Sequence, residues 1–149
     1  MNKVYKVFPG GKFKVLTFSY DDGKIEDRRL VKLFNKFNLK ATFNLNTGID
    51  PAIRIPQEEW PELYKGHDIA VHTFTHPTMI RLNDYAALKE ILEDKVNLEK
   101  IFKRPIYGLA YPNGSYDNRI VDIAKSVGIK YARVTNDKYA ATKAAEAYA

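Results

Sequence analysis

The feature that most constrains the fold of this chain is a repeated alternation between helical and strand-like segments. Four times, a stretch with helical periodicity ends at a short stop and is followed by an apolar run typical of a buried strand. Strands that alternate with helices are typical of α/β proteins with a parallel sheet. Because 149 residues are the usual size of one domain, we expect a single α/β domain.

The same pattern predicts where the elements lie. Strands are expected at residues 15–18, 40–45, 68–72, 106–110 and 130–134. Helices are expected at residues 27–37, 62–65, 84–102 and 118–127, the first with its buried face at Leu30, Leu33, Phe34 and Phe37. The alanine-rich stretch 139–149 has few large apolar residues, so we expect the domain to span 1–138 and the rest to be a C-terminal extension.

Composition and charge argue against several other classes of protein. The net charge is +6, but the 24 basic residues are scattered among 18 acidic ones, so we expect no nucleic acid partner. No apolar run approaches the roughly 18 residues that a membrane span needs. Cysteine is absent, which excludes disulfides and thiolate chemistry. The first residues lack the layout of a secretory signal, which predicts a cytoplasmic protein, or action at the cell envelope if the chain is a fragment.

Residues suited to chemistry follow three of the expected strands. Asp21 and Asp22 come after the first strand, His72 after the third, and the turn 111–114 after the fourth. In parallel α/β sheets the carboxyl ends of the strands lie on one side, and ligands bind there. We therefore expect these three loops to converge on one face of the sheet.

The sequence HTFTHP contains His72 and His76, whose spacing on a helix or tight turn lets both imidazoles reach one metal ion. A carboxylate from a converging loop would complete a site with a position open for water and substrate, as a catalytic zinc needs. The residue after His72 is Thr73, not the glutamate of the zinc-protease motif. Two histidines and a carboxylate also serve non-haem iron oxygenases, but the alternation of helices and strands favours hydrolysis.

Two adjacent aspartates can divide the work of such a site. One can bind the metal and the other can take a proton from the attacking water. Adjacent side chains of a strand point to opposite faces, so Asp21 and Asp22 can serve one site only if the chain bends there. Gly23 allows such a bend at little cost in free energy. The alternative is an ordinary acidic turn. His67, between a helix stop and a strand, is expected to bond backbone groups.

Together these motifs resemble the polysaccharide deacetylases of the NodB-homology type, the fourth family of carbohydrate esterases. Their T-F-D-D-G motif is similar to TFSYDDG at 17–23, with two extra residues before the aspartates. Their H-[S/T]-x-x-H motif matches 72–76 within KGHDIAVHTFTHP. LKATFNL and GIKYARVT resemble further segments of the family, so the resemblance covers about residues 14–135.

The resemblance implies a fold and a metal site. The fold would be a distorted β/α barrel, here incomplete, with five to six of about seven strands. By position, Asp22, His72 and His76 would bind a divalent metal, with zinc expected first and cobalt, manganese or nickel as alternatives. Asp21 would be the catalytic base.

The family's third motif, R-x-P-[Y/F]-G, aligns with AYPNG at 110–114. The arginine is replaced by Ala110 and the aromatic residue by Asn113. The resemblance implies that the backbone N–H of Asn113 steadies the oxyanion, which the side-chain change leaves intact. Tyr111 and Pro112 are expected to contact the substrate.

The resemblance implies a metal-dependent hydrolase that removes N-acetyl or O-acetyl groups from a carbohydrate such as an N-acetylglucosamine polymer or peptidoglycan. The family's late histidine, its general acid, is not visible, because no histidine follows His76. Two alternatives stay open: a hydrolase of the same fold acting on amide C–N bonds of small non-sugar substrates, and a shortened barrel that binds metal or glycan without turnover. A shortened barrel also leaves a homo-oligomer open.

Overall fold

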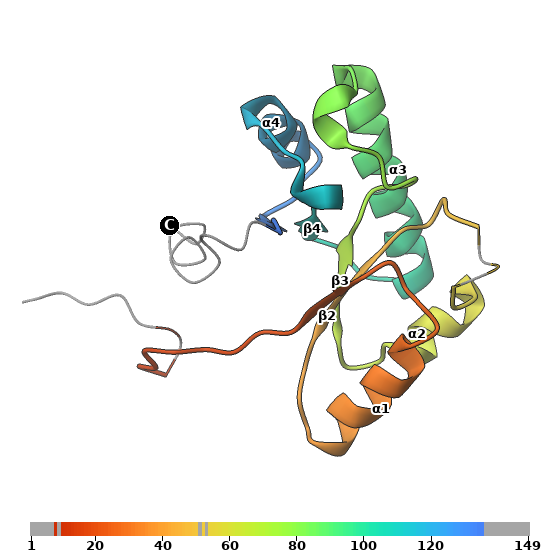
Figure 1. Cartoon of the computed structure of the whole chain (residues 1–149), viewed down its shortest axis with the longest axis vertical. Coiled ribbons are helices and arrows are strands. Elements are labelled where there is room, and N and C mark those ends of the chain that lie inside the picture. Colours follow the sequence, from red (N-terminus) through yellow and green to blue (C-terminus); the bar gives the residue numbers. More distant parts are fainter. Residues whose placement is uncertain (1–7, 9, 51, 53, 136–149) are drawn as a thin grey trace, which may run out of the picture.

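The computed structural model describes residues 8, 10–50, 52 and 54–135, and within them five strands form one parallel sheet (Figure 1). The strands are β1 (Ser19–Asp21), β2 (Thr42–Leu45), β3 (Asp68–Val71), β4 (Gly108–Ala110) and β5 (Tyr131–Arg133). Their order in the sheet is their order in the chain, and every neighbouring pair is parallel. The sheet curls into an open half-barrel flanked by helices, so the predicted incomplete β/α barrel is confirmed.

Helices connect the successive strands of this part of the chain. The α-helices are α1 (Asp27–Lys36), α2 (Trp60–Leu63), α3 (Asp84–Phe102) and α4 (Asn118–Ser126). Short 3-10 helices are η2 (Gln57–Glu59), η3 (Met79–Arg81) and η4 (Pro112–Gly114). Helices α3 and α4 pack against each other, while α1 and α2 lie toward the other end of the molecule (Figure 1).

Helix α3 has the bounds that the sequence predicts, because strong signals mark both of its ends. The side chain of Asn83 accepts a hydrogen bond from the Ala86 N–H at 2.9 Å and caps the first turn. Lys103 adopts a left-handed conformation, which ends the helix two residues before Pro105. Each terminus of α3 thus carries a local signal that the sequence shows.

The buried face of α1 differs in part from the predicted one. Val31 and Phe34 are buried, whereas Leu33 and Phe37 are exposed. The helix is amphipathic, but its apolar stripe is wider than its contact with the sheet, and Leu33 and Phe37 lie on the side of the stripe that faces away from Val31. The contact face is set from the sheet side, where the ring of Phe34 packs 5.0 Å from that of Phe18.

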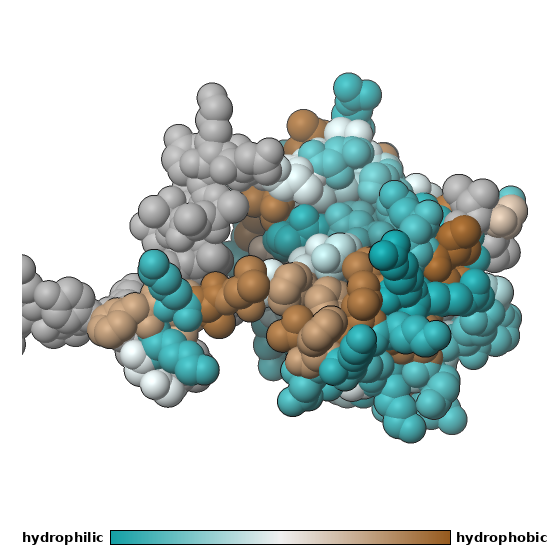
Figure 2. Space-filling model, turned by 60° about the horizontal axis from the view of Figure 1, so that its bottom comes forward, coloured by the Kyte–Doolittle hydropathy of each residue, from teal (hydrophilic) through white to brown (hydrophobic). Residues whose placement is uncertain are grey.

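The predicted strand at 15–18 is wrong, because β1 begins only at Ser19. Val15 and Leu16 are 55% and 76% exposed. In the described part of the chain β1 pairs only with β2, whose first residue Thr42 lies opposite Ser19, so the residues before 19 extend past the end of their neighbour. Figure 2 shows hydrophobic surface along the segment that precedes β1, to which Phe13, Val15 and Leu16 contribute.

The core lies around the three central strands. β2, β3 and β4 are buried along nearly their whole length, whereas the residues of β5, at one edge, are only half-buried. Residues 139–149 lie outside the described residues, so the predicted terminal extension stays a prediction. Among the described residues, none of the helices combines the length and the apolar character needed to cross a membrane.

Candidate metal centre

The loop after β1 brings both aspartates to the carboxyl end of the sheet. Asp21 is the last residue of β1, and Asp22 has a left-handed backbone with φ of 80°. Gly23 is left-handed as well, at φ of 65°, so the bend that the sequence predicts at Gly23 begins one residue earlier. The Asp22 N–H donates to the Asn44 carbonyl at 2.9 Å, which ties the loop to the end of β2.

The loop after β3 carries the two histidines in an irregular turn rather than a helix. Thr73 and His76 are left-handed, with φ of 66° and 60°. His72 is buried, and its Nδ1 lies 2.8 Å from the Ala110 carbonyl oxygen. That carbonyl can only accept, so Nδ1 carries the proton and Nε2 is left with a free lone pair. Burial lowers the pKa of His72, against the opposing effect of the Asp21 carboxylate, and so favours the neutral ring that binds metals.

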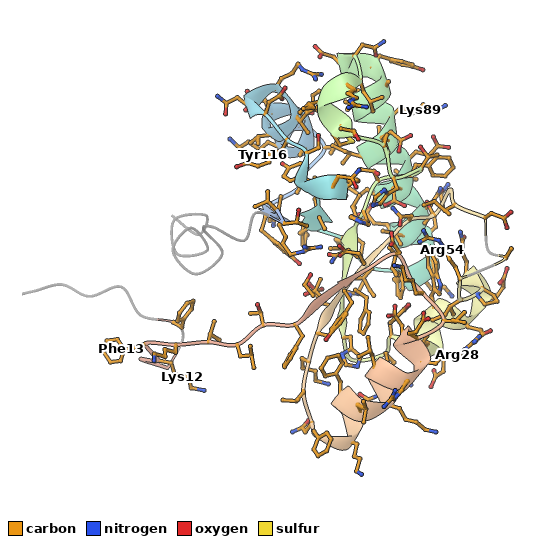
Figure 3. The ribbon with its side chains drawn as sticks, viewed as in Figure 1. Lys12, Phe13, Arg28, Arg54, Lys89 and Tyr116 are labelled. Atoms are coloured by element: carbon orange, nitrogen blue, oxygen red, sulfur yellow. The ribbon has the colours of Figure 1, made fainter. Side chains whose placement is uncertain are left out.

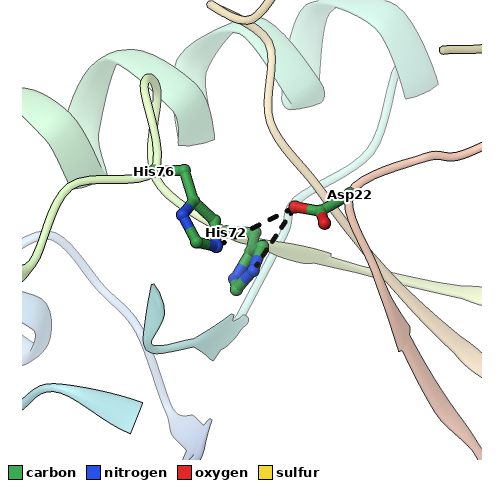
Figure 4. A group of neighbouring side chains, drawn as sticks. All are labelled: Asp22, His72 and His76. Atoms are coloured by element: carbon green, nitrogen blue, oxygen red, sulfur yellow. Dashed lines mark ion pairs between the residues drawn. The ribbon is translucent and has the colours of Figure 1, made fainter. Parts of the chain in front are cut away.

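Asp22, His72 and His76 meet at one point (Figure 4). Asp22 Oδ1 lies 3.9 Å from Nε2 of His72 and 3.9 Å from Nε2 of His76. One ligand atom from each residue lies within 4.8 Å of the other two. Two ligands of one zinc ion, each about 2.0–2.2 Å from it, can be at most about 4.4 Å apart, so a small closure fits these residues around a cation.

The Asp22 carboxylate supplies an independent sign that a cation fits. Its Oδ1 is buried and accepts no hydrogen bond from the described residues, although Arg54 Nη1 lies 3.6 Å from it. A buried carboxylate oxygen that accepts no hydrogen bond is costly, and such atoms usually accept one or bind a metal. The donor set of one carboxylate and two neutral imidazoles suits a divalent ion such as zinc. The residues present therefore fit the metal that the sequence predicts.

Asp21 lies beside this cluster but has other partners. Its Oδ2 is 3.8 Å from His72 Nε2, and its Oδ1 accepts from Asn44 Nδ2 at 2.7 Å. Both carboxylate oxygens also accept from Nη2 of Arg133, the last residue of β5. Burial raises the pKa of Asp21, but the hydrogen bond and charge of Arg133, together with the hydrogen bond from Asn44, outweigh it, so the pKa lies below its usual value. Asp21 is thus held ionised and oriented.

The turn after β4 completes the convergence of three loops that the sequence predicts. The Ala110 carbonyl that receives His72 Nδ1–H immediately precedes this turn. Pro112 is buried, and Asn113 is exposed with φ of 56°. Tyr111 is only 4% exposed and stacks on Tyr116, with ring centroids 5.3 Å apart.

Trp60 and His67 lie in the core. The ring of Trp60 is buried, and its Nε1 donates to the Ile55 carbonyl at 2.9 Å. His67 is buried at the opposite end of β3, where its Nδ1 accepts from the Ala41 N–H at 3.3 Å. The prediction that His67 bonds a backbone group is therefore confirmed.

Four polar residues that support the centre were missed by sequence reasoning: Asn46, Arg54, Asp94 and Arg133. Asp94 is fully buried on α3 and accepts from the Thr47 N–H at 2.7 Å and the His72 N–H at 3.0 Å. Burial raises the pKa of Asp94 to about 7. One signal was available: Asp94 interrupts the apolar stripe of α3 between Ile91 and Leu98, and a charge there needs a buried partner.

Comparisons with known proteins bear on the family and the fold of the chain. The family model described as polysaccharide deacetylase matches residues 9–132. The structure of deacetylase PplD from Streptococcus pyogenes, in complex with acetate, is similar with a TM-score of 0.80 and 26% identity over 86% of this chain. A polysaccharide deacetylase from Bacillus cereus, BC0361, has a TM-score of 0.74 and 22% identity over 85% of this chain.

The same fold also occurs in a protein described as a pseudoenzyme. BA3943 from Bacillus anthracis, a CE4 family pseudoenzyme, has a TM-score of 0.62 and 19% identity over 78% of this chain. No curated protein matches the sequence. The present chain spans 58% of the length of PplD, 42% of BC0361 and 42% of BA3943. With a family model covering most of its residues and a half-barrel shared with these structures, the chain belongs to the polysaccharide deacetylase family.

Proposed function

We propose that the protein is a metal-dependent hydrolase that removes N-acetyl or O-acetyl groups from a carbohydrate such as an N-acetylglucosamine polymer or peptidoglycan. The observation that carries the proposal is the buried Asp22 oxygen that accepts no hydrogen bond and faces two imidazole nitrogens, with Asp21 beside them. Family membership supports the reaction type. The similar structure of PplD holds acetate, the product that a deacetylation releases.

In this proposal Asp22, His72 and His76 hold the cation, with zinc expected first and cobalt, manganese or nickel as alternatives. A divalent cation there supplies Lewis acidity to an acetyl carbonyl and to a water molecule. The bond from His72 Nδ1 to the Ala110 carbonyl keeps the ring in the tautomer that binds, and orients Nε2 toward Asp22.

Asp21 acts as the general base that accepts the proton of the attacking water. Its bonds to Arg133 and Asn44 fix the carboxylate and keep it ionised at neutral pH. Because these bonds also weaken Asp21 as a base, a cation held by the three proposed ligands would supply the acidity that the water needs. Base and metal ligand are thus neighbours in the sequence with different environments.

The turn after β4 is assigned to the acetyl group and the sugar. We assign the backbone N–H of Asn113 to the negative charge that develops on the carbonyl oxygen. Pro112 contributes an apolar wall, and Tyr111 contributes mainly by backing Tyr116, whose ring is 46% exposed and offers a flat face to a sugar. Figure 3 shows Tyr116 among the side chains near α4.

The proposal is tested by acetate release from N-acetylglucosamine oligomers, peptidoglycan and a panel of small non-sugar amides, with added zinc, cobalt or manganese. We expect metal-stimulated acetate from a carbohydrate, abolished by a chelator and restored by the metal. Turnover confined to non-sugar amides would contradict the substrate class. Bound metal without turnover on any substrate would contradict the enzyme.

The second candidate is a binding module without turnover. One observation favours it: the BA3943 pseudoenzyme shares the fold. Retention on a glycan matrix that requires metal, together with no acetate release over days, would favour this candidate.

A further inference from the structure

One arginine reaches the metal centre from outside every motif. Arg54 lies between β2 and η2, with its side chain 12% exposed. Its Nη1 donates to the backbone carbonyl of Asp22 and lies 3.6 Å from the carboxylate Oδ1 of the same residue. The segment is pinned to the same loop by a bond from the Ile55 N–H to the Gly23 carbonyl, 3.0 Å long. Arg54 is labelled in Figure 3.

A buried asparagine holds the other ligand loop. Asn46 directly follows β2, and its Nδ2 donates to the carbonyl of His72 at 2.5 Å and to that of Thr73 at 2.9 Å. Thr73 is β-branched and left-handed, a conformation that persists only where its surroundings hold it. Asn46 therefore fixes the turn that presents His72 and His76.

Arg54 and Asn46 also contact each other, so their hydrogen bonds form one continuous bridge between the two ligand loops. Arg54 Nη1 lies 3.3 Å from Asn46 Oδ1, on the opposite side of the amide from the two carbonyls. The bridge runs from the Asp22 carbonyl through Arg54 and Asn46 to the backbone of His72. It joins the loops after β1 and β3, which supply the metal ligands, through the strand that lies between them.

We propose that Arg54 and Asn46 are positioning residues that set the separation between the Asp22 carboxylate and the two imidazoles, and thereby the affinity and geometry of the metal centre. This inference rests on the metal centre of the proposed function. A guanidinium so close to Asp22 repels a cation, so a role through charge alone predicts that its removal tightens metal binding. A role through position predicts the reverse.

Metal affinity separates the two roles. Arg54→Met keeps the buried stem and removes every donor, and Asn46→Leu keeps the volume and removes the amide. The matched control is Lys24→Met, which removes a positive charge 3.5 Å from Asp22 Oδ2 but from an exposed side chain outside the bridge. Zinc and cobalt affinities are measured by calorimetry without substrate, and circular dichroism checks folding.

We expect Arg54→Met and Asn46→Leu each to weaken zinc binding about 10–100-fold, the usual cost of losing a group that orients a ligand. Lys24→Met should stay within about fivefold of wild type, on the tighter side. The double variant should be about as weak as the weaker single variant, because either break opens the same bridge. Arg54→Lys should restore part of the affinity. The visible spectrum of the bound cobalt should change in both bridge variants and stay unchanged in Lys24→Met.

Zinc affinity of Arg54→Met equal to or tighter than that of Lys24→Met, with an unchanged cobalt spectrum, would overturn the inference. If Arg54→Met does not fold, Asn46→Leu and Arg54→Lys carry the same comparison. Wild-type protein that binds no cation would overturn both the inference and the proposed function. Wild-type protein that binds zinc but releases no acetate would overturn the function alone, and the affinities would still decide the inference.

Discussion

The two ends of β3 each hold a buried histidine, and they are built differently. His67 precedes the strand and His72 follows it. His67 packs among the rings of Phe34 and Phe43, with centroids 6.0 and 5.4 Å away, and its Nδ1 accepts a backbone hydrogen bond. His72 instead donates from Nδ1 to a carbonyl and turns Nε2 toward two carboxylates.

The difference teaches that burial alone does not mark a functional histidine. Burial lowers the pKa of both rings. What distinguishes His72 is the direction of its hydrogen bond, which frees the nitrogen that faces acidic groups, and the strained turns around it. Of the six non-glycine residues with positive φ in the described ranges, Asn38 and Lys103 end helices, and the other four lie in the three loops of the centre: Asp22, Thr73, His76 and Asn113.

The largest effect is expected from the carboxyl end of β3. His72→Ala removes a ligand, so zinc affinity should fall more than about 100-fold, beyond the cost of a lost orienting group, and acetate release should vanish. His67→Gln, at the other end, should leave both unchanged. Calorimetry and the acetate assay check the pair. Equal losses in both variants would contradict the distinction between the two ends.

Substitutions of the two adjacent aspartates should also differ in their effects on zinc affinity and on activity. Asp21→Asn should slow acetate release about 10²–10⁴-fold, the usual worth of a general base, while zinc affinity is kept. Asp22→Asn should lose zinc affinity and activity together. Rates at saturating zinc, compared with the two binding isotherms, check this division. Loss of zinc from Asp21→Asn but not from Asp22→Asn would reverse the roles.

A smaller effect is expected at Arg133. Its paired contact with Asp21 fixes the orientation of the proposed base, so Arg133→Met should lower kcat about tenfold with little change in KM or zinc affinity. Arg133→Lys cannot reproduce a contact to both oxygens and should recover only part of the rate. Steady-state kinetics of the two variants check this. A change confined to KM would place Arg133 in substrate binding instead.

The smallest effect concerns stability at the amino end of β3. Burial, with a smaller effect of Lys40, lowers the pKa of His67 in the folded protein below the ordinary 6.5. Its contribution to stability is therefore complete above pH 6.5 and is lost as pH falls through the folded value. His67→Gln keeps an acceptor for the Ala41 N–H and should lessen this acid loss, by at most about 1.4 kcal/mol per pH unit. Urea unfolding at pH 7.5 and 5.5 checks it; equal acid sensitivity would contradict it.

The sequence predicts most of the fold because its signals are local. Asn83 and Lys103 mark both ends of α3, and the alternation of elements is enough to place three loops on one face. The predicted strand at 15–18 is wrong for a non-local reason. Its apolar residues are typical of a strand, but the neighbouring strand β2 starts opposite Ser19. Pairing partners, not composition, decide where β1 begins.

The support of the site is harder to predict than its candidate ligands. Asp22, His72 and His76 stand out by residue type and spacing. Arg133 is 112 positions from Asp21 in the sequence, and Asn46 contacts carbonyls 26 and 27 positions away. The partners in these hydrogen bonds are far apart in the sequence, so no local sequence pattern predicts them. Residue types and spacing in the sequence predict the candidate ligands, whereas only the structure shows which residues hold them in place.

The most direct test of the account is a crystal of the zinc-loaded protein measured at the zinc absorption edge. We predict one anomalous peak per chain, bounded by Asp22 Oδ1 and by Nε2 of His72 and His76, with Asp21 adjacent but not bonded to the ion. A peak elsewhere, or no peak despite zinc in the crystal, would contradict it.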